Sequence, residues 1–197
     1  MTAAAPLLLF DLDGTLTDNS IGIARSIAYA LDRLGAPVPD AGALRRCMGP
    51  PLRESFAWLL DTDDRDAIEQ AIACYRERFA DVGWRENVVY AGIPEVLAGL
   101  AAGPGRVFLC TSKPELYARR IVQLFGLSEH LHGIYGADLA GTLDDKVKLF
   151  AHVAAPGDDP VIGDRHAGEH IGLAHEHADG RGHRLGACRR QRGEVAP

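Results

Sequence analysis

Short apolar runs alternate with longer amphipathic segments in two separate parts of the chain. Leu7–Phe10 is wholly apolar and precedes Asp and Gly, which is typical of a strand buried on both faces of a parallel sheet. After Gly92 the pattern predicts helices over 93–102, 114–125 and 146–154, and strands over 106–110, 133–135 and 160–162. This alternation predicts an α/β fold built on a doubly wound parallel sheet.

The stretch between these two parts contains only helical patterns. Apolar residues recur at helical spacing over 20–34, 40–47, 52–60 and 65–82, and no strand signal is found before Tyr90. We therefore expect an all-helical cap domain over 18–89, inserted into a core domain formed by 1–17 and 90–165.

The last part of the chain fits neither pattern. Residues 165–197 hold five of the eight histidines, six of the eighteen arginines and six glycines, with few large apolar residues. A further strand and its covering helix need more apolar material than this. The composition of 166–197 therefore indicates an atypical tail, which is either poorly folded or the product of a frameshift or sequence error near residue 166.

Composition narrows the function classes. Apolar residues make up 47% of the 197 residues and charged residues 24%, and the net charge is −6 with no basic block before residue 160. This argues against a nucleic-acid partner. The beginning of the chain has neither a positive region nor a long apolar run, which argues against a membrane partner and favours a cytoplasmic location. The four cysteines, at 47, 74, 110 and 188, form no CxxC pair and are expected to be reduced thiols.

Candidate chemistry begins directly after the first strand. Asp11 and Asp13 stand two residues apart where ligands bind in open α/β sheets, and strand alternation predicts that both side chains lie on the same side. Two carboxylates this close need a cation or a proton between them. Oxygen donors of this kind suit Mg²⁺, and Gly14 permits the sharp turn that follows.

The run Asp11-Leu12-Asp13-Gly14-Thr15-Leu16 resembles the first motif of the haloacid dehalogenase superfamily, and Asp18 fits its phosphoglycolate-phosphatase-like branch. The likeness extends from about residue 7 to residue 165. It implies a Rossmann-like core with an inserted cap. It also implies that Asp11 attacks phosphorus to form an aspartyl-phosphate, while Asp13 serves as general acid and base.

The remaining motifs of that family find candidates in order along the chain. The resemblance implies that Thr111 and Ser112, at the end of the next core strand, bind phosphate. It also implies a lysine, and the chain has only three, at 113, 146 and 148. We predict Lys146, at a helix start after an acidic loop, as the phosphate-binding lysine.

The last motif supplies the metal site. The resemblance implies that Asp164 joins Asp11 and Asp13 as a metal ligand. It also implies another acid four residues later, where this chain has Gly168, so either Glu169 takes that part through a shifted turn or the second acid is absent. In the cap, Arg53 follows a Gly-Pro-Pro loop and is predicted to meet an anionic substrate group.

These motifs favour a Mg²⁺-dependent phosphomonoester hydrolase acting on a small phosphorylated metabolite, phosphoglycolate-like or a nucleotide. Asp13 argues against haloacid dehalogenation, because that reaction needs a nucleophile but does not use this acid–base aspartate. A phosphonate hydrolase needs a cap lysine, and 18–89 contains none. Two alternatives stay open: a sugar-phosphate mutase, and a catalytically impaired protein that binds metal and phosphate.

Overall fold

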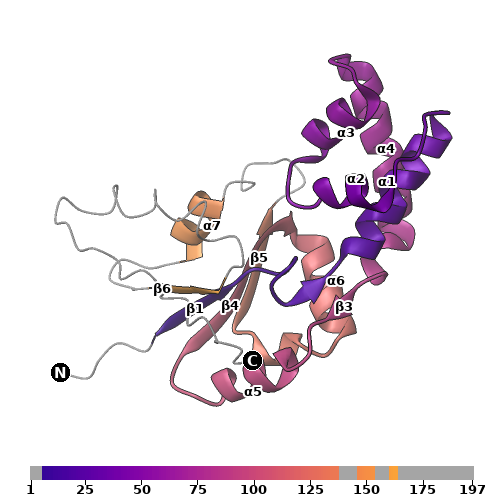
Figure 1. Ribbon diagram of the computed structural model, residues 1–197. Coiled ribbons are helices and arrows are strands. Elements are labelled where there is room, and N and C mark those ends of the chain that lie inside the picture. The colour runs from indigo at the N-terminus through magenta and orange to yellow at the C-terminus, as the bar shows by residue number, and fades with distance from the viewer. Residues whose placement is uncertain (1–5, 138–145, 154–159, 164–197) are drawn as a thin grey trace, which may run out of the picture.

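The computed structural model describes residues 6–137, 146–153 and 160–163 (Figure 1). The strands are β1 (Leu7–Phe10), β2 (Thr17–Asp18), β3 (Val88–Val89), β4 (Arg106–Pro114), β5 (Gly133–Ala137) and β6 (Pro160–Gly163). The α-helices are α1 (Ser20–Arg33), α2 (Ala41–Arg46), α3 (Leu52–Leu60), α4 (Arg65–Asp81), α5 (Ile93–Ala101), α6 (Glu115–Leu124) and α7 (Lys146–Val153). Two short 3₁₀ turns are η1 (Gly83–Arg85) and η2 (Ser128–His130).

The central sheet has the order β5-β4-β1-β6, and all neighbouring strands are parallel. Helices α5 and α6 cover one face and α7 covers the other (Figure 1). The predicted α/β fold with a doubly wound parallel sheet is therefore confirmed. The order places β1 between β4 and β6, so residues that follow these three strands meet at one edge of the sheet.

Both faces of the sheet are apolar because helices cover both. Leu7 and Leu9 of β1 pack in a cluster with Leu149 of α7, whereas Leu8 and Phe10 contact the cluster under α5 and α6. The short apolar run of β1 is thus a strand that is buried on both faces, and it fixes the position of the turn that follows it.

The helices α1–α4, called the cap helices here, share a separate hydrophobic cluster. Phe56 of α3 is fully buried there, beside residues of α1 and α4. Asp40 and Asp64 are the N-cap residues of helices α2 and α4. Their carboxylates accept hydrogen bonds from backbone N–H groups in the first turn. The predicted helix ends agree with the observed ones to within one residue wherever both ends are described.

The expectation that no strand occurs between the first strand and Tyr90 is wrong. β2 and β3 form a two-stranded antiparallel ladder at the base of the cap helices, with Thr17 opposite Val89. Strands of two residues are too short to show a period of two, so the sequence carries no pattern for them. This ladder holds together the two chain segments that enter and leave the cap helices.

Several predictions concern residues beyond this description. The tail over 166–197, Asp164, Gly168 and Glu169 all lie outside the described residues. Cys47, Cys74 and Cys110 are free thiols, as expected, and Cys188 lies outside the described part. No helix within the described ranges is long and apolar enough to cross a membrane.

Candidate active site

The turn after β1 places the two aspartates. The carbonyl oxygen of Leu12 accepts hydrogen bonds from the backbone N–H groups of Thr15, Leu16 and Thr17, which closes a tight loop. Gly14 has φ of 77° in this loop, a conformation that costs glycine little and other residues more. Asp11 is 6% exposed at the end of the strand. The loop turns the chain back, so that Asp13 lies at the same edge of the sheet.

Asp13 makes a short ion pair that the sequence did not indicate. Lys113 Nζ donates a hydrogen bond to Asp13 Oδ2 at 2.6 Å, and the lysine side chain is 5% exposed while that of Asp13 is 30% exposed. The other carboxylate oxygen, Oδ1, is buried and has no hydrogen-bond partner among the described residues. Among the described residues, Asp13 is therefore held by one oxygen only.

Lys113 reaches the site because β4 is longer than predicted. The strand continues past Cys110 to Pro114, and Thr111 and Lys113 are buried on either side of the exposed Ser112. The register to β5 shifts between Thr111 and Pro114, and at Gly136 of β5 a side chain would collide with the Lys113 carbonyl oxygen. Strand alternation from Thr111 is the signal that could have identified Lys113.

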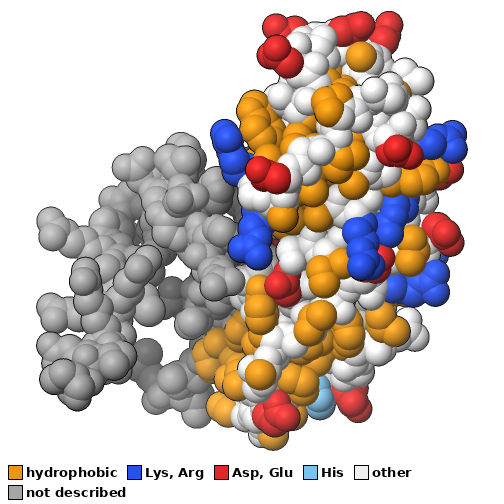
Figure 2. Space-filling model, turned by 45° about the vertical axis from the view of Figure 1, so that its right-hand side comes forward, with side chains coloured by type: hydrophobic (Ala, Val, Ile, Leu, Met, Phe, Trp, Pro, Cys, Tyr) orange, Lys and Arg blue, Asp and Glu red, His pale blue; other side chains and the backbone are white. Residues whose placement is uncertain are grey.

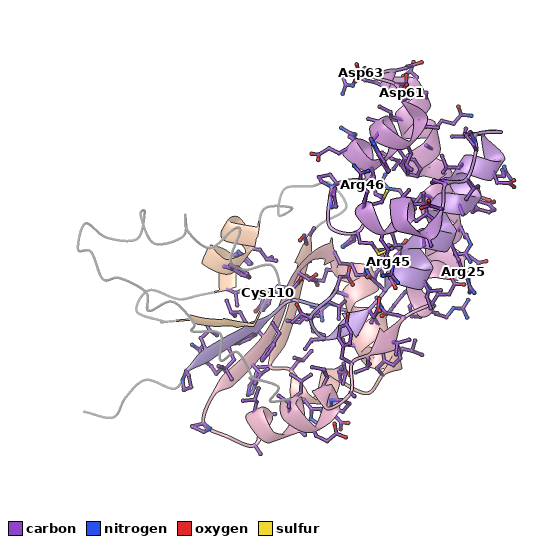
Figure 3. All side chains as sticks on the ribbon, viewed as in Figure 1. Arg25, Arg45, Arg46, Asp61, Asp63 and Cys110 are labelled. Atoms are coloured by element: carbon purple, nitrogen blue, oxygen red, sulfur yellow. The ribbon has the colours of Figure 1, made fainter. Side chains whose placement is uncertain are left out.

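Burial and negative charge raise the pKa of two neighbours of the aspartates. Burial, and after it the charge of Asp11, raises the pKa of the Cys110 thiol to about 12. Cys110 lies within the sheet (Figure 3) and stays a neutral thiol. In α4, burial first and the charge of Asp13 second raise the pKa of the Tyr75 hydroxyl. Tyr75 shows that α4 comes close to the turn of residues 11–17, which is called the catalytic turn here for the role that we propose for it below.

Aromatic side chains lie between α4 and the sheet edge. Phe79 of α4 stacks on Tyr75 with ring centroids 5.4 Å apart, and the edge of Tyr117 in α6 meets Phe79 at 5.2 Å. Lys113 Nζ lies over the Phe79 ring, 5.2 Å from its centroid. One lysine thus touches both the catalytic turn and a cap helix.

The other predicted site residues lie in different settings. Arg53 is the second residue of α3 and forms an ion pair with Glu69 of α4 at 2.7 Å, with side chains 65% and 46% exposed. Lys146 is the first residue of α7, whose helix covers the β4 and β5 side of the sheet. The structure therefore brings Asp11, Asp13 and Thr111 to one edge, with Lys113 as an addition.

The chain matches a known protein family over most of its length. A sequence model of haloacid dehalogenase-like hydrolases matches residues 8–147, which include the catalytic turn, the cap helices and the end of β4. The chain belongs to the haloacid dehalogenase-like hydrolase family. The resemblance seen in the Asp-x-Asp motif is thereby confirmed.

Similar proteins of this family carry several names. The chain is 44% identical to a 5'-nucleotidase of Pseudomonas aeruginosa over 75% of its length and 66% of that protein. It is 39% identical to the tyrosine-protein kinase PtkA of Mycobacterium tuberculosis over 76% of its length and 50% of the kinase. It therefore spans only half to two thirds of the lengths of these relatives.

A solved structure agrees with the fold. The crystal structure of a predicted phosphatase from Clostridium acetobutylicum superposes with a TM-score of 0.72 at 34% identity, covering 81% of this chain and 76% of that one. The α/β fold of this chain is thus shared with that structure.

The donor groups at the turn fit a divalent cation. Asp11 and Asp13 bring two carboxylates, against which Lys113 supplies one positive charge, and a phosphate group would add further negative charge. Carboxylate and phosphate oxygens are the ligands that Mg²⁺ prefers. Asp164, the third predicted ligand, is outside the described residues, and within them no three acidic, histidine or cysteine side chains are grouped so that they could hold a metal ion.

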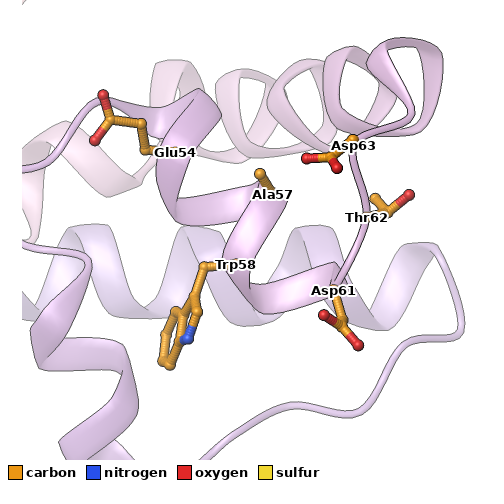
Figure 4. A pocket seen from close by; sticks show the side chains of 6 residues that line it. All are labelled: Glu54, Ala57, Trp58, Asp61, Thr62 and Asp63. Carbon is orange, nitrogen blue, oxygen red and sulfur yellow. The ribbon is translucent and has the colours of Figure 1, made fainter.

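A separate shallow hollow lies near the far end of the cap helices (Figure 4). Its lining comes from α3 and the loop after it: Glu54, Ala57, Trp58, Asp61, Thr62 and Asp63. Acidic side chains gather at this end of the molecule (Figure 2). None of the catalytic-turn residues lines this hollow, so it is distinct from the site at the sheet edge.

Proposed function

We propose that this protein is a Mg²⁺-dependent phosphomonoester hydrolase that acts on a small phosphorylated metabolite through an aspartyl-phosphate intermediate. The observation that carries the proposal is the turn in which Asp11 is buried at the end of β1 while Asp13 is anchored by Lys113 through one oxygen. A nucleophile and a proton carrier are the two groups that such a reaction needs from the protein.

In the first step a carboxylate oxygen of Asp11 attacks the phosphorus atom. The bond between phosphorus and the ester oxygen breaks, and the departing oxygen takes a proton from Asp13. Lys113 occupies Oδ2 of Asp13, so the buried Oδ1 is the oxygen that remains to carry this proton. An acid protonated at Oδ1 still accepts the hydrogen bond from Lys113 at Oδ2.

In the second step a water molecule attacks the same phosphorus atom. Asp13, now a carboxylate, takes a proton from that water at Oδ1, and the bond between phosphorus and Asp11 breaks. The products are inorganic phosphate and the regenerated Asp11 carboxylate, and Asp13 is protonated again.

Asp11, Asp13 and Asp164 would hold the Mg²⁺ ion, Asp13 through its backbone carbonyl oxygen, because Lys113 and the transferred proton use its two carboxylate oxygens. When bound, the ion would offset the negative charge of the phosphoryl oxygens. Thr111, which is 1% exposed at the end of β4, and Ser112 would bind phosphate oxygens together with Lys146. The residues 18–89 would form the cap, and Arg53 its contact with an anionic part of the substrate.

The names of the relatives support a small substrate. Besides the 5'-nucleotidase, a phosphoglycolate phosphatase of Pseudomonas putida is 30% identical over 67% of this chain and 50% of that protein. Both names denote hydrolases of small phosphate esters. A soluble substrate of this kind agrees with the cytoplasmic location predicted from the sequence.

The test is release of phosphate from p-nitrophenyl phosphate with and without Mg²⁺, for the full chain and for Asp11→Asn. We expect Mg²⁺-dependent activity that Asp11→Asn removes. Asp32→Asn is the matched control, because Asp32 is an exposed aspartate of α1 and should leave activity unchanged. Equal activity in the wild type and Asp11→Asn would overturn the mechanism.

A folded wild type without activity would instead favour the impaired, binding form of the protein. Phosphate transfer between sugar phosphates without net phosphate release would favour the mutase alternative. Trapping of a phosphorylated chain after rapid acid quench, absent in Asp11→Asn, would support the covalent intermediate.

A further inference from the structure

The ammonium group of Lys113 has two neighbours of different kinds. On one side is the carboxylate of Asp13 at 2.6 Å, and on the other the Phe79 ring at 5.2 Å from its centroid. The side chain is 5% exposed, so water takes little part in solvating the charge. A buried ammonium group needs both an anion and a polarisable or polar surface around it.

Phe79 is itself held in place. The ring stacks on Tyr75 at an interplanar angle of 12° and meets Tyr117 nearly at right angles, at 86°. Phe79 is 6% exposed. Helix α4 runs from the far end of the cap helices down toward α6, and Phe79 lies near its lower end (Figure 1). The position of this ring therefore follows the position of α4 relative to the core.

We propose that Phe79 is a positioning residue for the acid–base carboxylate, acting through Lys113. This inference rests on the proposed function, because it assumes that Asp13 transfers protons. The ring face attracts the ammonium group and keeps it at Oδ2 of Asp13. Oδ1 then stays available for the proton, and a helix of the cap contributes to the chemistry without touching the reacting atoms.

The contact can be tested without any activity. The chain has only three lysines, so lysine labelled with ¹³C at Cε gives three signals, and Lys113→Arg identifies that of Lys113. We expect the Lys113 signal of the wild-type chain to be shifted upfield by the ring current of Phe79. Phe79→Leu should move it toward the position of an exposed lysine. A wild-type Lys113 signal at the position of an exposed lysine would overturn the proposal.

Phe56→Leu is the matched control for this substitution. Phe56 is fully buried in the same cluster and contacts Tyr75, but no contact joins it to Lys113 among the described residues. Both variants lose one buried ring of the cap helices, so the midpoint temperature of thermal unfolding should fall in both. Only Phe79→Leu should shift the Lys113 signal.

Kinetics give the functional half of the test. We expect kcat for p-nitrophenyl phosphate to fall about 3- to 10-fold in Phe79→Leu, the range of one cation–π contact, while KM changes less than about 2-fold. Phe56→Leu should keep the wild-type kcat, and Phe79→Tyr, which retains a ring, should restore most of it.

Equal losses of kcat in Phe56→Leu and Phe79→Leu would reduce Phe79 to a packing residue and overturn the inference. A wild type without activity would count against the proposed function, whereas the lysine spectrum would still decide the contact.

Discussion

Two clusters of charged side chains join distant parts of this chain, one at the catalytic turn and one at the base of the cap helices. At the base, Glu86 accepts hydrogen bonds on both carboxylate oxygens, from Arg78 at 2.8 and 3.0 Å and from Arg25 at 2.7 Å. Arg25 lies on the side of the cap helices (Figure 3). At the turn, Lys113 engages one carboxylate oxygen of Asp13, and the part of the chain that the structure describes offers no partner to the other.

This difference separates structural from chemical use of a carboxylate. A carboxylate whose acceptor positions are filled stabilises the fold and is unavailable for proton transfer. A carboxylate held by one oxygen is fixed in place while the other can exchange a proton. We therefore expect substitutions at the base to lower stability, and substitutions at the turn to lower activity with a smaller effect on stability.

The largest effect should come from removing the lysine of the turn. In Lys113→Met we expect kcat to fall about 100-fold, the scale seen when a preorganised charged donor is removed from an active site. Phosphate release from p-nitrophenyl phosphate measures it, and denaturant unfolding measures the accompanying change in stability. Lys148→Met is the control and should keep activity. Wild-type activity in Lys113→Met would show that the ion pair with Asp13 serves only the fold.

The second prediction concerns the contact of α1 with η1 at the base. A Cβ atom on Gly22 would lie inside van der Waals contact of the Gly83 carbonyl oxygen, and backbone cannot move aside as a flexible side chain can. Gly22→Ala should lower the free energy of unfolding by about 2–3 kcal/mol. Gly99→Ala is the matched control, because Gly99 is exposed in α5 with open space around it, and it should raise stability by about 0.5–1 kcal/mol. Urea unfolding of both variants compares them, and equal stability would contradict the close approach.

The third prediction uses the pH dependence of Glu86. Hydrogen bonds from Arg78 above all, and then from Arg25, hold the pKa of Glu86 below its usual value of 4.5, although burial opposes them. A carboxyl with a lowered folded-state pKa stabilises the fold above its unfolded pKa, and this contribution is lost as pH falls through the folded pKa. Glu86→Gln should cost about 1–2 kcal/mol at pH 7 and less at low pH. Urea unfolding between pH 7 and pH 3 measures the loss, and a cost that does not shrink on acidification would contradict the assignment.

The sequence predicted a place at the sheet edge only for polar residues that directly follow an apolar pattern. Asp11 and Asp13 stand directly after the apolar run of β1, so the strand end identified them. The sequence does not indicate Lys113, because the apolar pattern of β4 stops at Cys110. The strand itself continues through Thr111 and Ser112. Burial of Thr111 and Lys113 depends on helix packing far away in the sequence, and hydrophobic periodicity carries no record of it.

The fold was easier to predict than the site for a related reason. Each helix and each strand of the sheet buries its own apolar face, so the pattern records it locally. The ladder of β2 and β3 has only two residues in each strand, and Val88 of this ladder remains exposed. The pairing of Phe79 with Lys113, likewise, joins two elements that the sequence places on either side of the cap boundary.

The smallest effect on stability should come from the exposed pair of Arg53 and Glu69. Because both side chains are largely in water, breaking the pair should change the free energy of unfolding by less than about 1 kcal/mol. If Arg53 meets an anionic group of the substrate, Arg53→Met should raise KM for a doubly charged phosphate ester about 10-fold and leave kcat intact. Glu69→Gln breaks the same pair but releases Arg53, so it should not raise KM. Steady-state kinetics of the two variants therefore separate a role in recognition from a surface ion pair, and a matching rise in both would assign the effect to the lost pair.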